Sequence, residues 1–288
     1  MRAIVIGSDG LVGGALFSAL AAGGLDVIGT TRRFDRVVAG RTVHFDLTEP
    51  DIAGIPSADI VFICAAMTSF AACRALPQLA KQINCVAPEA LASYLVSTGT
   101  KVVFLSTSAV FDCQAPLMQP DRDYGGESMY GQSKAEAERR ILGLGRLATV
   151  VRLTKIVSPG QQLFRGWVAA LGRRQSIEAF DDHRISPITI QHGVDALTAI
   201  ATRGEGGIYQ ISGASDASYY EIASYLASRI GAESSLVHPC SAASRGLPAE
   251  EITPFTSLDC ARLSDLTGFR PPQPLNAIER VLLSESEP

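Results

Sequence analysis

The sequence predicts an α/β fold, in which a doubly wound parallel sheet is accompanied by a smaller, interleaved C-terminal lobe. Three observations support this prediction. Short β-branched runs alternate with helical stretches through about the first 155 residues. These runs are nearly continuously apolar, which is typical of strands covered by helices on both faces. Beyond Val157 the alternation is broken by Pro159-Gly160, which indicates a second structural unit.

The expected elements follow one another in βαβ order. Strands are predicted at 2–6, 26–30, 42–46, 60–64, 101–106 and 149–153, and helices between them at 12–22, 79–98 and 130–143. Further on we expect a helix at 162–171, a polar turn at 181–187, a strand and helix over 188–201, a strand at 207–212, a helix at 218–230, a Ser/Ala/Pro-rich stretch and a short tail. We therefore assign 1–157 to the sheet domain, to which 186–213 return, and 158–185 and 214–288 to the smaller lobe.

Charge and composition argue against several classes of protein. The 288 residues carry a formal net charge of −4 without a basic run, which argues against nucleic-acid binding and electrostatic membrane attachment. No stretch approaches the roughly 18 consecutive apolar residues of a membrane-spanning helix, and residues 1–8 enter a strand directly, so we expect a cytoplasmic protein. The six cysteines form no CxxC pair and the four histidines no HxxxH pair, which favours reduced thiols and no metal site.

A glycine-rich turn, GSDGLVG at 7–13, follows the first strand and opens the first helix. Gly7 permits the tight turn, Gly10 lets a pyrophosphate approach the backbone, and Gly13 lets the helix pack closely. The N–H groups of the first helical turn, with Leu11 and Val12, then face the phosphates. A plain strand–helix joint is the alternative, but the flanking strand and helix favour a Rossmann dinucleotide-binding unit.

The end of the second strand, Thr30-Thr31-Arg32-Arg33, indicates which dinucleotide binds. An NAD site has a carboxylate there for the ribose 2′-hydroxyl, whereas this chain has two guanidinium groups. Arginine suits a 2′-phosphate, so we predict NADP(H) in preference to NAD(H), with Thr31, Arg32 and Arg33 at the phosphate. A solvated turn is the alternative. Asp46-Leu47 closes the third strand where an adenine edge would lie, and a simple turn explains it nearly as well.

Tyr130 and Lys134 stand four residues apart, and therefore on one face of a helix. A nearby cation favours the phenolate, so we expect Lys134, together with an oxidised nicotinamide, to lower the pKa of Tyr130 for acid–base catalysis. Thr107 lies at the end of the preceding strand, where its hydroxyl can polarise a carbonyl. YxxxK alone is a weak pattern and a Ser/Thr-rich strand end also caps turns, but the order of the three motifs favours catalysis.

The order of these motifs resembles that of the extended short-chain dehydrogenases/reductases. After GxxGxxG come Ala65-Ala66 behind the fourth strand, Asn84, STSAVFD at 106–112 and YGQSKAEAE at 130–138. Within this family the chain is most similar to dTDP-4-dehydrorhamnose reductases and related sugar-nucleotide reductases. Supporting pieces are QINCVAP at 82–88, VRLT at 151–154, Ser186-Pro187 and GIYQISG at 207–213, so the likeness covers most of residues 1–213.

The resemblance implies an NADPH-dependent oxidoreductase that reduces the C4 keto group of a nucleotide-linked deoxysugar. Tyr130 is then the proton donor, Lys134 its partner and a ligand of the ribose hydroxyls, and Thr107 the carbonyl-polarising group. The sheet domain becomes the NADP-binding domain, with Ala65 and Ala66 beside the cofactor, and the smaller lobe binds the substrate.

Several positions depart from the family pattern. Ser108-Ala109 stand where the rhamnose reductases usually have an acid and an aromatic residue. The resemblance therefore implies that Ser108 lies at the substrate-binding site. Gln191-His192 replaces a common acidic pair, and Cys73-Arg74 lies in a helix that is usually acidic. His183 and Arg184 lie where the second lobe approaches the cleft. Arg184 suits a diphosphate, and an exposed loop is an equal alternative.

Two other functions stay open at this point. An epimerase or dehydratase of the same family is one, although a dehydratase typically has an Asp-Glu pair where this chain has Ser108-Ala109. A dinucleotide-binding sensor without catalysis is the other, since fold alone does not establish function. The intact set of Thr107, Tyr130 and Lys134 favours an enzyme. The family also makes a homodimer an alternative to a monomer, because apolar helix faces in a sequence do not distinguish core from interface.

Overall fold

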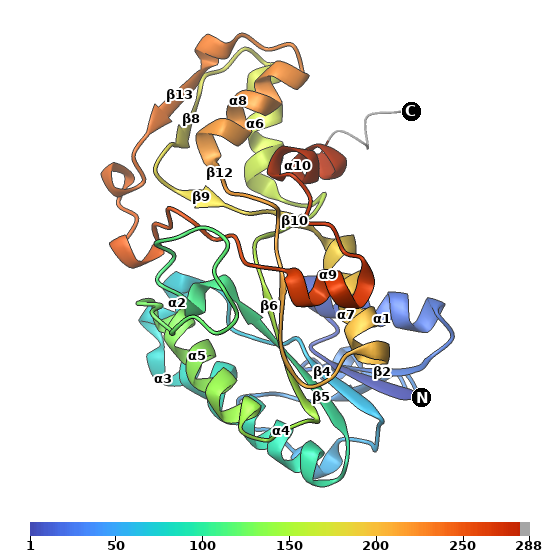
Figure 1. Cartoon of the computed structure of the whole chain (residues 1–288). Coiled ribbons are helices and arrows are strands. Elements are labelled where there is room, and N and C mark those ends of the chain that lie inside the picture. The colour runs from blue at the N-terminus through green and yellow to red at the C-terminus, as the bar shows by residue number, and fades with distance from the viewer. Residues whose placement is uncertain (283–288) are drawn as a thin grey trace.

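The central feature is one parallel sheet of seven strands in the order β11-β6-β5-β4-β1-β2-β3 (Figure 1). The computed structural model describes residues 1–282, and every neighbouring pair in this sheet is parallel. The strands are β1 (Arg2–Ile6), β2 (Asp26–Thr31), β3 (Thr42–His44), β4 (Ile60–Ile63), β5 (Lys101–Thr107), β6 (Ala148–Leu153) and β11 (Gly207–Ile211). The predicted doubly wound α/β fold is confirmed.

Helices cover both faces of this sheet because successive side chains of a strand point to opposite faces. In β1, Ala3 and Val5 pack in one core with α1 (Leu11–Ala22) and α7 (Ile190–Arg203). Ile4 and Ile6 pack in the opposite core with α4 (Ala87–Ser97) and α5 (Met129–Leu142). All four of these β1 side chains are fully or almost fully buried.

The predicted helix at 79–98 is wrong as one regular element. It consists of α3 (Pro77–Lys81), a π-helical turn η3 (Gln82–Val86) and α4. Pro88 supplies the physical reason, because it has no N–H to donate to the carbonyl of Asn84 four residues earlier. A further helix, α2 (Phe70–Ala75), precedes α3, and the Ser69 side chain caps its first turn by accepting a hydrogen bond from Ala72 N.

A second lobe lies above the carboxyl edge of the sheet in Figure 1, around its own apolar core. Its helices are α6 (Gln162–Gly172), α8 (Tyr219–Arg229) and α10 (Pro274–Leu282). Its short strands form the parallel pair β8 (Ile177–Phe180) and β13 (Val237–Cys240) and the antiparallel pair β9 (Arg184–Ile185) and β12 (Ala217–Ser218). The strand pair β7 (Ile156–Val157) and β10 (Ile188–Thr189) connects the lobe to the sheet.

Three stretches are more regular than the sequence predicts. The polar turn at 181–187 contains β9, the Ser/Ala/Pro-rich stretch contains β13, and the tail contains α9 (Ala261–Thr267) and α10. The strands were missed because each is too short for a periodic pattern and forms only by pairing across the lobe.

The division of the chain into two domains stays a prediction. Leu263 of α9 packs in the core of the sheet beside α7, far from the core of the second lobe. Residues 283–288, which the prediction assigns to the second lobe, lie outside the described part of the chain. Within residues 1–282, no helix is long and apolar enough to cross a membrane.

A buried ion pair joins the sheet to the helix that carries Tyr130 and Lys134. Arg152 of β6 and Glu138 of α5 are 1% and 0% exposed, and Nη2 of the arginine lies 2.7 Å from Oε2 of the glutamate. The same guanidinium donates to the carbonyl of Pro120 (2.9 Å) and to Oε1 of Gln210 in β11 (3.2 Å). The Tyr124 hydroxyl donates to Glu138 at 3.0 Å. The pair therefore holds α5, two strands and the 120–124 loop in one arrangement.

Glu138→Gln is expected to lower the free energy of unfolding by about 3–5 kcal/mol, because it leaves the Arg152 charge buried without its counter-ion. The double variant Glu138→Leu/Arg152→Met should recover part of that loss, since neither charge remains. Urea unfolding measures both. Glu136→Gln is the matched control: Glu136 pairs on the surface with Arg140 and Lys81, so its loss should cost less than about 1 kcal/mol. Equal effects of the two single variants would contradict this role.

Candidate active site

A cavity of about 1040 Å³ runs along the carboxyl edge of the sheet, from the glycine loop to the second lobe. Strand ends of a parallel sheet are where ligands bind in such folds. The structure brings to this cavity all the predicted site residues except Arg184. They are Gly7, Gly10, Leu11, Val12, Gly13, Thr31, Arg32, Arg33, Asp46, Leu47, Ala65, Ala66, Thr107, Ser108, Tyr130 and Lys134.

The glycine loop is closed by contacts that leave no room for side chains. Gly7 has a φ of +85°, and a Cβ on it would lie 2.7 Å from the Cβ of Ala65. A Cβ on Gly13 would lie 2.3 Å from the carbonyl oxygen of Gly7. Glycine at these positions keeps α1 against the strand end and leaves its first turn open to the cavity.

The end of β2 presents two arginines and, close to them, a carboxylate. Arg32 and Arg33 line the cavity and are largely exposed. Asp9, which also lines it, accepts a hydrogen bond from the Thr31 hydroxyl at 2.5 Å and lies 3.6 Å from Nη1 of Arg36. Its charge is therefore engaged by neighbours, whereas the two arginines present their side chains to the cavity. Sequence reasoning did not assign Asp9 a role, and its position inside the glycine motif was the available signal.

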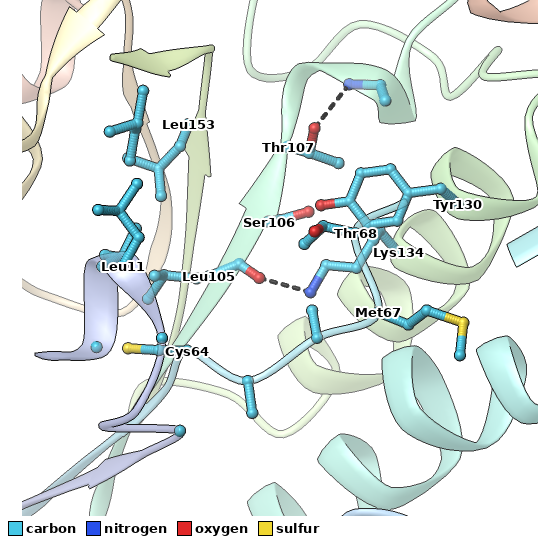
Figure 2. A pocket seen from close by; sticks show the side chains of 18 of the residues that line it. Leu11, Cys64, Met67, Thr68, Leu105, Ser106, Thr107, Tyr130, Lys134 and Leu153 are labelled. Atoms are coloured by element: carbon cyan, nitrogen blue, oxygen red, sulfur yellow. Dashed lines mark hydrogen bonds between the residues drawn. The ribbon is translucent and has the colours of Figure 1, made fainter. Parts of the chain in front are cut away.

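Tyr130 and Lys134 lie in the first two turns of α5, which begins after the side chain of Ser128 caps Gly131 N. Figure 2 shows both side chains directed at the end of β5. The Lys134 amine donates to the carbonyl of Leu105 at 2.6 Å and lies 3.6 Å from the centroid of the Phe104 ring. These contacts hold the amine at the floor of the cavity.

Two hydroxyls at the end of β5 face Tyr130. Thr107 Oγ1 accepts a hydrogen bond from Ala109 N at 3.2 Å, and its own hydrogen is directed at the Tyr130 hydroxyl. Ser106 Oγ is buried without a hydrogen-bond partner among the described residues, and in Figure 2 the Tyr130 hydroxyl points toward it. A buried hydroxyl without a partner is costly, and such groups are typical of functional sites.

The expected lowering of the Tyr130 pKa by Lys134 is not what this structure shows. Burial raises the pKa of Tyr130 to about 12, and the hydrogen bond with Thr107 only partly opposes this. Burial also lowers the pKa of Lys134 to about 7, with Glu138 opposing. The reason is that both groups lose water while the amine turns toward a backbone carbonyl. The pair is therefore set up as a neutral phenol beside a lysine that titrates near neutrality.

The π-helical turn supports the cavity wall behind Tyr130. Asn84 is fully buried, accepts from Met67 N at 2.8 Å and donates to Met67 O at 3.0 Å. It also donates to the hydroxyl of Ser133 on α5, at 3.3 Å. Asn84 thereby ties the segment after β4, which lines the cavity, to α5. Wide helical turns of this kind often occur at functional sites.

The second lobe closes the far end of the cavity. His183 lies there, where the sequence analysis expects the lobe to approach the cleft, whereas the other residues of this end had no predicted role. The residues nearest the end of β6 are Thr154 and Lys155, and those from the second lobe include His183, Tyr219, Glu251 and Thr253. Arg184 lies outside: it donates to Glu221 at 2.9 Å and to the carbonyl of Asp216 at 3.2 Å. Because its charge is already paired there, this placement does not support a substrate contact by Arg184. Lys155 follows a strand end, which is the signal that could have identified it.

The described residues contain no group of three or more His, Cys, Asp or Glu side chains placed to hold a metal ion.

Comparisons with known proteins show the family and support the fold. Residues 1–286 match the family model described as RmlD substrate binding domain. The dTDP-4-dehydrorhamnose reductase of Mycobacterium tuberculosis is 25% identical over 284 residues, which cover 93% of this chain and 89% of that protein. A solved dTDP-4-dehydrorhamnose reductase from Bacillus anthracis in complex with NADP has a TM-score of 0.82 at 21% identity, covering 98% of this chain and 99% of that one. MoeE5 in complex with UDP-glucuronic acid and NAD has a TM-score of 0.81 at 21% identity, covering 99% and 98%.

Lys134→Met is expected to change how stability depends on pH. The folded chain holds this amine at a pKa of about 7, against 10.5 when exposed, so between these values the unfolded chain binds the extra proton. The free energy of unfolding should therefore rise with pH in this window, by at most about 1.4 kcal/mol per pH unit from this group. The variant should lose this part of the slope. Urea unfolding at several pH values from about 7 to about 9.5 measures it, with Lys101→Met as the exposed control. A slope that survives in Lys134→Met would show that other groups cause it.

Proposed function

The chain belongs to the RmlD substrate binding domain family, and from this premise we propose that it is an NADPH-dependent oxidoreductase that reduces a keto group of a nucleotide-linked deoxysugar. One observation carries the proposal: Thr107, Tyr130 and Lys134 come together at the sheet edge, in the same cavity as the glycine loop. The relatives named dTDP-4-dehydrorhamnose reductase favour this activity over an epimerase or a sensor without catalysis.

The glycine loop fits a dinucleotide. Gly7 and Gly13 are positions where a Cβ would collide with backbone or Ala65, so the loop keeps its inner surface bare. Backbone N–H groups at Leu11 and Val12 in the first turn of α1 would hold the pyrophosphate. Arg32 and Arg33 would hold a 2′-phosphate, which supports NADP(H) in preference to NAD(H). When bound, the reduced nicotinamide supplies the hydride.

The chain's own residues then handle the proton. When the substrate binds, Thr107 donates to its carbonyl oxygen the hydrogen that it otherwise directs at Tyr130, and so polarises the carbonyl, while its Oγ1 still accepts from Ala109 N. Tyr130 donates its phenolic proton to the same oxygen as negative charge develops there. A phenol whose pKa is about 12 carries its proton at neutral pH, which suits the reductive direction.

Lys134 balances the charge left on Tyr130. With a pKa near 7 the amine is partly neutral before reaction, and a new phenolate close by favours its protonated form. The hydrogen bond to Leu105 O fixes the position from which it acts. Lys134 is thus proposed to stabilise the phenolate rather than to prepare it in advance.

Two further proposals concern the protein as a whole. A cytoplasmic location is supported by the cysteines, because all six are free thiols in the structure. A homodimer is supported by exposed apolar side chains on neighbouring segments from α2 to α4, namely Leu76, Val86 and Tyr94.

Tyr130→Phe should lower the consumption of NADPH with a 4-keto nucleotide sugar by about 10²–10⁴-fold, because the proton donor is lost. The affinity for NADPH should stay nearly unchanged. Absorbance of reduced nicotinamide measures the first and fluorescence titration the second. Tyr220→Phe, on α8 and outside the cavity, is the control and should behave as wild type. Wild-type turnover in Tyr130→Phe would remove this residue from the mechanism.

The double variant Arg32→Ala/Arg33→Ala should weaken NADPH binding by roughly tenfold or more for each charge-assisted hydrogen bond that it removes. NADH should lose little affinity, since it has no 2′-phosphate. Parallel titrations with both dinucleotides test this. Arg203→Ala is the control, because Arg203 is exposed in the last turn of α7 and does not line the cavity. Equal losses of affinity for the two dinucleotides would contradict the assignment of the arginines to the 2′-phosphate.

A further inference from the structure

Lys155 places a positive charge in the cavity on the side away from the glycine loop. It stands two residues beyond the end of β6, and its carbonyl accepts a hydrogen bond from Ile188 N at 2.9 Å. Its ammonium lines the cavity and has no hydrogen-bond or ion-pair partner within residues 1–282. Burial lowers the pKa of this amine. The Lys155 side chain is exposed along the cavity. An ammonium that a cavity exposes without a protein partner can pair with an anionic oxygen of a ligand in a charge-assisted hydrogen bond.

His183 is held beside it as a directed hydrogen-bond donor. Its Nδ1 accepts a hydrogen bond from the backbone N–H of Thr253 at 3.1 Å, so the neutral ring carries its hydrogen on Nε2. The ring stacks on Tyr219 with centroids 5.1 Å apart and planes inclined by 25°. Within the described residues, neither Nε2 of His183 nor the Tyr219 hydroxyl has a hydrogen-bond partner, although both side chains line the cavity.

Lys155 and His183 lie within electrostatic reach of each other. Burial lowers the pKa of His183, Asp182 opposes this, and the charge of Lys155 adds to the lowering. The carboxylates nearby are already engaged: Asp182 accepts from Ser241 (2.6 Å) and from Ala242 N (2.8 Å), and Glu251 pairs with Arg74. The lysine and histidine are therefore left as donors without an acceptor from the chain.

A further polar side chain near Lys155 and His183 lacks a hydrogen-bond partner among the described residues. Thr154 Oγ1 is buried without a partner in the part of the chain that the structure describes, and Thr154 lines the same cavity. The adjacent strand end adds no negative charge: Thr107, which pairs in register with Leu153, is followed by the neutral Ser108, which also lines the cavity. This end of the cavity therefore combines hydrogen-bond donors with a positive charge.

We propose that Lys155 and His183 bind an anionic oxygen group of the substrate and so determine which nucleotide sugars the cavity accepts. This inference rests on the proposed function. It concerns a group other than the cofactor's 2′-phosphate, because Arg32 and Arg33 follow β2, four positions from β6 in the sheet order. The anionic group has two sources in a nucleotide sugar: the diphosphate, or a carboxylate on the sugar.

The first experiment measures binding without turnover. Isothermal titration calorimetry with dTDP, UDP-glucose and UDP-glucuronate compares wild type with Lys155→Met and with Lys101→Met. Lys101 lies at the opposite end of β5, so its variant makes the same chemical change outside the cavity. Removal of a charge-assisted hydrogen bond should weaken binding of the affected ligands by about tenfold or more in Lys155→Met and leave Lys101→Met unchanged.

The ligands separate the two sources. If Lys155→Met weakens dTDP and both UDP-sugars alike, the lysine binds the diphosphate. If it weakens only UDP-glucuronate relative to UDP-glucose, the lysine binds a sugar carboxylate. If it weakens none of the three while NADPH titration shows an intact fold, the proposal is overturned. Because no ligand is turned over here, a failure of the proposed reductase activity shows separately, in the NADPH consumption assay.

The uptake of protons on ligand binding gives a second test, which would not respond if His183 had only a structural role. An anion beside the ring favours its protonated form, so ligand binding near pH 7 should take up protons. Titrations in two buffers of different ionisation enthalpy measure this uptake. His183→Gln keeps a hydrogen-bonding side chain but has no titrating ring, so it should bind with little proton uptake. Unchanged uptake in this variant would exclude His183 from the anion site.

Discussion

The active-site arrangement depends on the buried ion pair between Arg152 and Glu138. Tyr130 and Lys134 lie on α5 and Thr107 lies at the end of β5. No covalent link between these two elements fixes the distance between them. Glu138 stands one helical turn beyond Lys134, and Arg152 stands in register with Ser106 on the neighbouring strand. Since neither charge can return to water without the other, the helix and the sheet hold one relative position. The contacts to Pro120 and Gln210 extend this constraint to the 120–124 loop and to the edge strand β11.

The same exclusion of water sets the chemistry of the site. Burial makes Tyr130 a weaker acid and Lys134 a weaker base, so both start closer to their neutral forms than they would in solution. A phenol that keeps its proton at neutral pH is suited to donate that proton during reduction. It is less suited to act as a phenolate that is already present before reaction. At the other end of the cavity, Lys155 and His183 have no acceptor from the described residues, because the nearby carboxylates are held by closer partners.

Periodicity and spacing predicted the sheet domain well because its elements are long and locally encoded. All the strands expected before residue 155 form, and GxxGxxG and YxxxK lie at a strand end and on a helix, as expected. The second lobe was predicted less completely. Strands such as β9 and β13 form only by pairing with segments that are distant in the sequence. The helix expected at 79–98 contains a π-helical turn, where Pro88 has no N–H to donate to the carbonyl of Asn84.

The sequence by itself determined the fold, the dinucleotide motif and the set Thr107, Tyr130 and Lys134, because each follows from residue type and local spacing. The tertiary structure alone decided which second-lobe residue meets the cavity. Arg184 and His183 are neighbours in the chain, and no sequence rule separates them. In the fold, β9 turns Arg184 to Glu221 and leaves His183 against Tyr219 in the cavity wall. Which of two adjacent side chains points inward depends on how β9 pairs with β12, a pairing made 32 residues away.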